Sequence, residues 1–446
     1  MRPLGSHSSW PANPPVIVDP PSHASSVTRI TEVKPSSARG LTPPLGQEAL
    51  NGGGHDVAPQ ILRMYRRVLA EPRSVDAVAQ LAQAMANSGS ARRVDRKSAD
   101  IASTGGPSSL STLLCPLYLV GGGLDVPKVG VPGRPAGGVD VLGTLRGYRS
   151  TLSIDEVDGC IAEAGYVHIR ADATWAPADA ALFRLRQQEG TQAVPALAVA
   201  SILAKKVAAG VGVAGLEGRI APFGNFGDSI EAGRRNAMLY CRVALALGLE
   251  PIVILTDARV PFQPYIGRGE ALTALWKVVT HDLADAPWLA EHAALCMAMA
   301  MAVANRSSGL SSAGRQPVEV VSTHLNAQGT SMSELVRRVE ETSAQQFRTL
   351  VAGADGFVQY DLGRIRTALG EIAEVEKPKT ADVESDFDDP AGVRLLCPPG
   401  QRVRVGEPVM ELRYASGWPD RLTSGLFVIC DEAGPRTNVI MEVISQ

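Results

Sequence analysis

The stretch ASTGGPSSLST, residues 102 to 112, is rich in glycine and in side-chain hydroxyls. It follows a possible short strand at residues 98 to 101 and runs into the apolar segment LLCPLYLV, residues 113 to 120. Main-chain N–H groups would then lie free at a helix N-terminus, a place that attracts phosphate. The stretch contains no Lys, Arg or His. A phosphate-binding loop and a plain structural turn are both compatible with these residues.

The segments on either side of this loop have the pattern of an α/β fold. Between residues 99 and 173, short apolar runs alternate with glycine loops and helices, which is typical of βα units on a parallel sheet. A helical segment at residues 177 to 210 interrupts the pattern, which resumes with a helix at 230 to 247 and the strand PIVILTD, residues 251 to 257. The sequence therefore predicts a sheet domain that is split by a helical insertion.

The rest of the chain adds a helical part and a β-rich part. A Ser N-cap precedes the helical pattern VDAVAQLAQAMA, and β-type runs broken by Pro-Gly and Gly-Glu turns follow residue 355. We expect the acidic stretch TADVESDFDDP, residues 380 to 390, to be an exposed loop. The predicted parts are a disordered tail (1–40), an α-helical domain (41–95 and 177–208), an α/β domain with a mixed or parallel sheet (96–176 and 209–345), and a C-terminal α+β, barrel-sandwich-like domain (346–446).

Composition excludes several classes of partner. The chain has 446 residues and a net charge of -3, so nothing favours nucleic acid or an anionic membrane surface as a partner. The longest apolar helix candidate, residues 293 to 304, is shorter than the roughly 20 residues that cross a bilayer, and no secretory signal opens the chain. Six scattered cysteines without zinc spacing predict free thiols. We expect a cytoplasmic protein.

Three groups of residues could carry chemistry. Ser201 and Lys205 share one face of an apolar helix, which suits a heterocycle bearing carbonyls. Taken alone, Lys205 and Lys206 more often only end a helix near its negative pole. Asp257 ends an apolar strand, where α/β sheets place functional groups, and a turn cap is an equally good interpretation. Lys128 and Arg134 lie near a second glycine loop, where a lone basic residue is more often a solvated surface group.

Several motifs together resemble one enzyme family. They are DIASTGGPSSLST, PGRPAGG, WAPADAALFRLR, ASILAKKVAAG, LTDARVPFQPYIGRGEAL and DDPAGVRLLCPPGQRVRVGEPVMEL, in this order along the chain. From about residue 45 to its end the sequence resembles the thymidine and pyrimidine-nucleoside phosphorylases and the AMP phosphorylases. The resemblance implies an α domain, an α/β domain and a C-terminal α+β domain. It also implies phosphorolysis of a nucleoside or nucleotide to a free base and a sugar 1-phosphate.

The resemblance implies a role for each site residue. Arg186, Ser201 and Lys205 would hold the base, and Arg186 and Lys205 would stabilise the charge on the departing base. Asp257 would be the general acid, as in the AMP-phosphorylase branch. Phosphate, the co-substrate, would be bound by Ser103, Thr104, Gly105, Gly106 and Thr112. No metal or other cofactor is implied, and a homodimer is expected.

The loop departs from the thymidine-cleaving pattern, and two alternatives stay open. Ile101 and Ala102 stand where those members have Lys and His, Pro132 stands where a serine is expected, and the loop after Arg134 is shorter. DIASTGGPSSLST also resembles in places a loop of the anthranilate phosphoribosyltransferases, which use a diphosphorylated sugar with Mg²⁺. A catalytically silent nucleoside-binding homologue is the third possibility. The stretch GNFGDSIEAGRR leaves Asn225 and Arg234 as surface residues or substrate contacts.

Overall fold

The computed structural model describes residues 57–133, 137–224, 226–307, 314–375, 387–414, 417–434 and 440–445. Residues Leu45–Gln446 make one compact unit, and the fold below is that of this unit. The expected disordered tail lies outside the described residues, as do Arg134 and Asn225.

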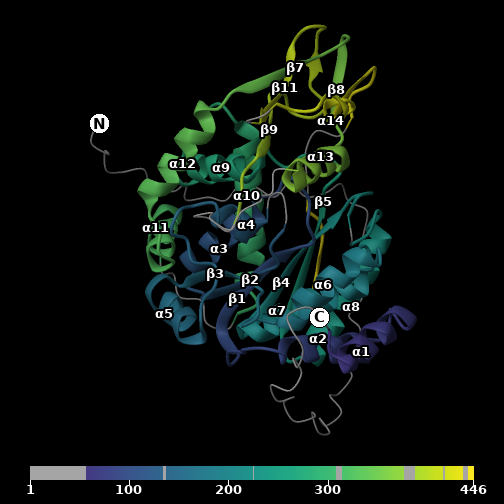
Figure 1. Ribbon diagram of the computed structural model, residues 1–446, viewed down its shortest axis with the longest axis vertical. Coiled ribbons are helices and arrows are strands. Elements are labelled where there is room, and N and C mark those ends of the chain that lie inside the picture. The colour runs from purple at the N-terminus through teal and green to yellow at the C-terminus, as the bar shows by residue number, and fades with distance from the viewer. Residues whose placement is uncertain are drawn as a thin grey trace. The chain divides into compact units, whose positions relative to one another are not determined.

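A four-stranded mixed sheet forms the centre of the unit (Figure 1). Its order is β1 (Asp95–Ser103), β4 (Val211–Ile220), β5 (Glu250–Asp257) and β13 (Ile440–Ile444). The first three strands are parallel, and β13 pairs antiparallel with β5. The predicted α/β fold with a mixed sheet is confirmed. The last strand of the chain lies in this sheet, although the sequence places it in a separate C-terminal domain, so the domain boundaries stay a prediction.

Both faces of the central sheet are covered because its strands are apolar on both sides. Ile252 and Ile254 of β5 belong to one apolar core, whereas Val253 and Leu255 belong to another, as the alternation of side chains along a strand requires. Helices of the second core are α1 (Pro59–Ala70), α2 (Val75–Ala86), α6 (Pro177–Gln188), α7 (Pro195–Ala209) and α8 (Ile230–Ala246). The helical insertion is therefore confirmed as α6 and α7, and Ser74 caps α2 as expected.

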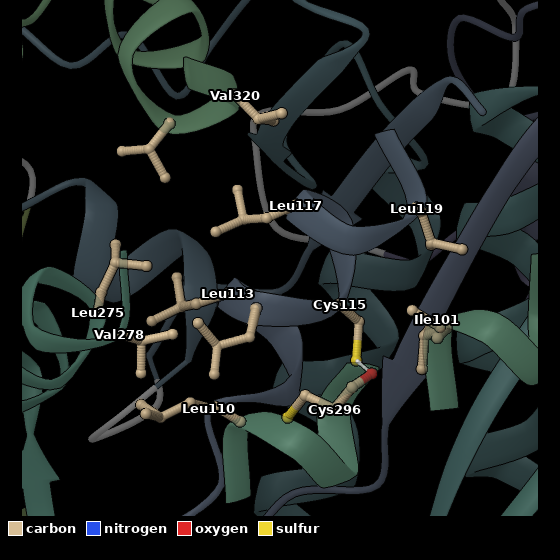
Figure 2. Packing of buried hydrophobic residues seen from close by; sticks show 14 of the residues in the cluster. Ile101, Leu110, Leu113, Cys115, Leu117, Leu119, Leu275, Val278, Cys296 and Val320 are labelled. Carbon is tan, nitrogen blue, oxygen red and sulfur yellow. Dashed lines mark hydrogen bonds between the residues drawn. The ribbon is translucent and has the colours of Figure 1, made fainter. Parts of the chain in front are cut away.

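The first core contains the helices that follow the glycine loop. They are α3 (Ser111–Gly121), α9 (Arg268–Val279), α10 (Pro287–Ala304), α11 (Pro317–Ala327) and α12 (Met332–Ala344). Figure 2 shows Ile101 of β1 beside Cys115 of α3 and Cys296 of α10. Helix α10 has 18 residues and is longer than the apolar segment at residues 293 to 304 that the sequence indicates. By length and composition alone it could cross a membrane. One face of it, with Cys296, Met299 and Val303, is fully buried in the core.

A second parallel pair, β2 (Val126–Gly130) and β3 (Tyr166–Arg170), lies next to β1 through a bridge between Ser98 and Asp125. Two short helices, α4 (Gly138–Leu142) and α5 (Ile154–Ala164), belong to this part of the fold. The six cysteines are free, as expected.

The C-terminal part contains two antiparallel sheets. One has the order β6 (Tyr265–Gly267), β9 (Ala391–Leu395), β11 (Pro408–Tyr414) and β7 (Phe347–Val351). The other has the order β10 (Arg402–Val403), β8 (Gly356–Tyr360) and β12 (Phe427–Cys430). Helices α13 (Leu362–Val375) and α14 (Asp420–Thr423) complete it.

The acidic stretch is not the exposed loop that the sequence predicts, at least over its described end. The side chain of Asp389 is 1% exposed and accepts from Arg413 and from Arg338, both at 2.7 Å. Arg413 is itself fully buried and also pairs with Glu270 at 2.5 Å. These contacts join β11 to α9 and α12. The prediction is wrong because the two arginines that bury Asp389 are distant in sequence.

Candidate functional site

Two glycines give the loop after β1 its shape. Gly105 has φ of 93° and Gly106 has φ of 143°, conformations that other residues rarely adopt. Within the described part of the chain, the amide of Gly106 donates to no acceptor. The loop therefore leaves a backbone donor available for an anion.

The predicted hydroxyl ligands of the loop differ in their surroundings. The Ser103 hydroxyl accepts from the Gly105 amide at 3.3 Å. The Thr104 hydroxyl is buried and accepts from the Arg219 amide at 2.9 Å, so it holds the loop to β4. Thr112 is partly exposed in the first turn of α3. Whether these residues bind phosphate stays a prediction.

A buried polar cluster that the sequence did not predict lies beneath the loop. Glu217 of β4 has a side chain with no exposure, accepts from the Ser111 hydroxyl at 2.5 Å, and pairs with Arg219 at 2.9 Å. Burial acts to raise the pKa of Glu217, but Arg219 and the Ser111 hydroxyl outweigh it and hold the pKa below its ordinary value. Two opposite charges two residues apart in the otherwise apolar strand VGVAGLEGRI are the signal that could have revealed this pair.

His292 of α10 also belongs to the buried cluster around Glu217. Its Nε2 accepts from the Leu110 amide at 2.8 Å, so the ring proton of the neutral imidazole lies on Nδ1. Burial lowers the pKa of His292 to about 3, which keeps the ring neutral at physiological pH. One amide at the start of α3 is thus occupied by a histidine that the sequence left without a role.

Two lysines converge on Asp100 of β1 behind the loop. The Nζ of Lys128 lies 2.5 Å from Oδ1 of Asp100, and the Nζ of Lys206 lies 2.6 Å from Oδ2. All three side chains are buried. Burial lowers the pKa of Lys206 to about 8, against the opposing effect of Asp100. The expectation that Lys128 is a solvated surface group is wrong, because its ammonium also donates to the Ile101 carbonyl at 2.6 Å.

The three residues expected to hold the base lie together on α6 and α7. Lys205 donates to the Ser201 hydroxyl at 2.9 Å and to Asp179 at 2.6 Å. Arg186 is buried, and its Nη1 donates at 3.5 Å to the carbonyl of Leu197, one turn before Ser201. Burial lowers the pKa of Arg186, and the Asp179 carboxylate opposes this effect. Lys205 is therefore part of a largely enclosed cluster of charges, with its side chain 11% exposed, rather than a solvated helix end.

Asp257 is paired in a way that bears on its expected role. Its carboxylate accepts from the Arg259 side chain at 2.6 and 3.0 Å, and from the Arg259 amide at 3.0 Å. The amide contact is the turn cap that the sequence offered as an alternative. Burial acts to raise the pKa of Asp257, but the contacts with Arg259 lower it overall. In this arrangement the carboxylate is ionised, whereas a general acid must carry a proton.

Hydrogen bonds connect these groups along one edge of the sheet. Because β1, β4 and β5 are parallel, their carboxyl ends lie at the same edge, with Ile220 of β4 beside Asp257. The loop after Asp257 returns to the glycine loop, where the Phe262 amide donates to the Ser108 hydroxyl at 3.0 Å. Helix α7 is held to β1 by Lys206, the neighbour of Lys205. The structure thus places the glycine loop and Asp257 at the carboxyl ends of strands of one sheet, with α7, the helix of Ser201 and Lys205, fastened to β1.

Comparison with known proteins gives one consistent group of relatives. A thymidine phosphorylase of Agrobacterium fabrum is 29% identical over 367 residues, 76% of this chain and 80% of that protein. One of Mycobacterium tuberculosis is 27% identical over 328 residues, 70% of this chain and 71% of that protein. A pyrimidine-nucleoside phosphorylase of Bacillus subtilis is 25% identical over 360 residues, 76% of this chain and 80% of that protein. The chain is a divergent relative of the thymidine and pyrimidine-nucleoside phosphorylases.

Two other comparisons add little to this relationship. No protein-family model matches the chain. A solved anthranilate phosphoribosyltransferase of Saccharomyces cerevisiae is 13% identical, covers 61% of this chain and 80% of its own, and superposes with a TM-score of 0.42. This likeness is too weak to bear on function.

The two residues of β1 that depart from the thymidine-cleaving pattern, Ile101 and Ala102, pack in or against the apolar cores of this chain. Ile101, where the sequence resemblance implies a lysine in the thymidine-cleaving members, is 1% exposed and packs in the first apolar core (Figure 2). The neighbouring Ala102 packs against the second core on the opposite face of the sheet. Arg234 pairs with Glu442 and has a side chain that is half exposed, which fits a surface role.

Proposed function

We propose that the protein is a pentosyltransferase that cleaves the N-glycosidic bond of a pyrimidine nucleoside, or of a related nucleotide, with phosphate. A phosphate oxygen forms a bond to the anomeric carbon of the sugar as the bond from that carbon to the base nitrogen breaks. The bonding electron pair leaves with the base, which takes up a proton. The products are a free base and a sugar 1-phosphate. One observation supports the proposal most directly. The Phe262 amide donates to the Ser108 hydroxyl at 3.0 Å, which joins the loop after Asp257 to the glycine loop at the carboxyl ends of the parallel strands.

The base would lie against the cluster on α6 and α7. Arg186, Ser201 and Lys205 offer a guanidinium, a hydroxyl and an ammonium, which are donors suited to ring oxygens and nitrogens that become negative in the transition state. The buried Asp179 carboxylate lies 2.6 Å from the Lys205 ammonium and supplies the opposite charge. Because Lys205 already donates to Ser201 and Asp179, the base would take a place in an existing hydrogen-bond network.

The phosphate would lie in the glycine loop, bound by Ser103, Thr104, Gly105, Gly106 and Thr112. Asp257 is the proposed proton donor to the base, and this role requires Arg259 to leave its carboxylate during turnover. The Arg259 side chain is 55% exposed, so it can turn toward solvent or toward substrate. We expect no metal or cofactor beyond phosphate.

A panel of purine and pyrimidine nucleosides and nucleotides, incubated with the full chain and phosphate, tests the proposal. Free base and sugar 1-phosphate are followed by chromatography. Lys205→Ala should abolish turnover, whereas Lys277→Ala, which removes another ion-paired lysine, on α9, should not. Turnover by Lys205→Ala equal to that of the natural chain would contradict the base site.

A catalytically silent nucleoside-binding protein is a second candidate, favoured by the ion pair that keeps Asp257 ionised. Nucleoside binding without turnover, in phosphate and in a diphosphorylated sugar with Mg²⁺ alike, would support it. Base exchange only with the diphosphorylated sugar would instead indicate a phosphoribosyltransferase. The cytoplasmic location, the homodimer and the lack of nucleic-acid and membrane partners stay expectations, and light scattering of the purified protein measures the oligomeric state.

A further inference from the structure

The side chain of Arg219 lies against the glycine loop. Its Nη1 donates to the Gly106 carbonyl at 3.1 Å, and its Nη2 lies 3.4 Å from the Ser111 hydroxyl. A Cβ atom at position 106 would lie 2.8 Å from Nη1. The guanidinium therefore occupies space that is left open because residue 106 is a glycine.

Arg219 retains a side-chain donor for which the described residues provide no acceptor. Its side chain is 3% exposed, and its Nε has no hydrogen-bond partner among the described residues. A guanidinium carries five N–H donors, and an unused donor in a buried place is costly. An anion bound within reach of the guanidinium would supply the missing acceptor.

Glu217 is the counter-ion of Arg219 and competes for the same donors. Its carboxylate accepts from Arg219 and Ser111, and the Thr256 hydroxyl donates to its other oxygen at 3.3 Å. A guanidinium and hydroxyl groups are also the donors that bind phosphate. A phosphate in the loop would therefore share the guanidinium with Glu217.

We propose that Arg219 is the cationic phosphate ligand of the glycine loop and that Glu217 weakens this binding by sharing its charge. The inference rests on the proposed phosphorolysis and names the residue that supplies positive charge to it. The charge comes from β4, whose Glu217 lies in register with Ser103, and not from residues 102 to 112. A guanidinium can donate to two phosphate oxygens at once, which a lysine ammonium does less well.

Variants of the full chain distinguish this role from a structural one. Glu217→Gln keeps the shape of the side chain and removes its charge, so the affinity for phosphate should rise about threefold or more. Adding Arg219→Met to Glu217→Gln removes both charges and leaves no carboxylate unpaired. In that double variant the KM for phosphate should rise roughly 10- to 100-fold, while the KM for nucleoside changes by less than about twofold. A matched control, Arg413→Met with Glu270→Gln, removes another buried pair and should leave the KM for phosphate unchanged.

Initial rates and calorimetric titration with inorganic phosphate alone give distinguishable outcomes. If the natural chain turns over a nucleoside and the double variant keeps its KM for phosphate, the role of Arg219 is overturned and the proposed function stands. If the natural chain binds phosphate without turning over any nucleoside, phosphorolysis fails. In that case loss of phosphate binding in the double variant supports Arg219, and retained binding overturns it. A natural chain that binds no phosphate overturns both.

Discussion

Replacing Gly106 by alanine should weaken phosphate binding through Arg219, and the same change at Gly105 provides the control. Both glycines have positive φ, so each substitution forces alanine into a conformation that costs about 1–3 kcal/mol. A Cβ at Gly105 meets nothing within 4 Å, whereas one at Gly106 lies 2.8 Å from Arg219 Nη1. The two variants therefore share backbone strain and differ in their effect on the guanidinium.

The size of the difference follows from the contact. Moving Nη1 from 2.8 Å to an ordinary separation of 3.4 Å needs a shift of 3.4 − 2.8 = 0.6 Å. Arg219 is held by Glu217 and by the Gly106 carbonyl. This shift therefore lengthens the 3.1 Å hydrogen bond to the Gly106 carbonyl and turns the guanidinium away from the loop. Losing one charged hydrogen bond costs about 1.5–3 kcal/mol, which is roughly tenfold or more in affinity.

Urea denaturation and phosphate titration of both variants measure the two effects separately. We expect similar losses of unfolding free energy, about 1–3 kcal/mol, and a dissociation constant for phosphate at least about tenfold higher in Gly106→Ala than in Gly105→Ala. Equal dissociation constants in the two variants would refute the reasoning, because the clash with Arg219 would then be without consequence for phosphate.

Three further predictions follow from buried or paired charges. Arg413→Met leaves the buried Glu270 carboxylate without its cation and removes one of the two arginines that pair with Asp389. The free energy of unfolding in urea should therefore fall by about 3–5 kcal/mol. A loss below about 1 kcal/mol would contradict this prediction. Arg259→Gln should raise the pKa of Asp257, because the contacts with Arg259 lower it. The limb of the pH–rate profile that reports the general acid should then move to higher pH. An unchanged profile would exclude Asp257 as the general acid. Burial lowers the pKa of three histidines: His168, His292 and His324. The unfolded chain therefore binds protons near pH 6.5 that the folded chain does not, so stability is lost as the pH falls from 7 to 5, by about 2 kcal/mol per histidine. Melting temperatures at the two pH values measure this loss, and equal values would contradict it.

The sequence predicts those parts of the fold whose causes are local. Helices α6 and α7, strand β5 and the Ser74 cap follow from periodicity and from single capping residues. The position of β13 does not, because its pairing with β5 joins residues nearly 200 positions apart. Burial of Asp389 has the same origin, since hydrophobicity alone makes an acidic stretch look exposed.

The candidate site shows the same division between local and distant causes. The glycine loop and the spacing of Ser201 and Lys205 are visible in short motifs. The pairing of Arg219 with the loop depends on the register of β1 against β4, which no single motif encodes. Even so, the charged residues of GLEGRI are a usable signal, because an apolar strand can bury opposite charges only when they pair.

Isoleucine at position 101 and alanine at position 102 do not leave this part of the molecule without positive charge. Asp100 is flanked by Lys128 and Lys206, which leaves one net positive charge buried behind the loop while Lys206, with a pKa of about 8, stays protonated. Charges in a buried, weakly polarisable region act over longer distances than charges in water. The lysine pair can thus favour an anion near the end of β1 without touching it, while Arg219, neutralised overall by Glu217, contributes the directed donors. This separation of charge from contact is compatible with an apolar core residue at position 101, in the strand that precedes the glycine loop.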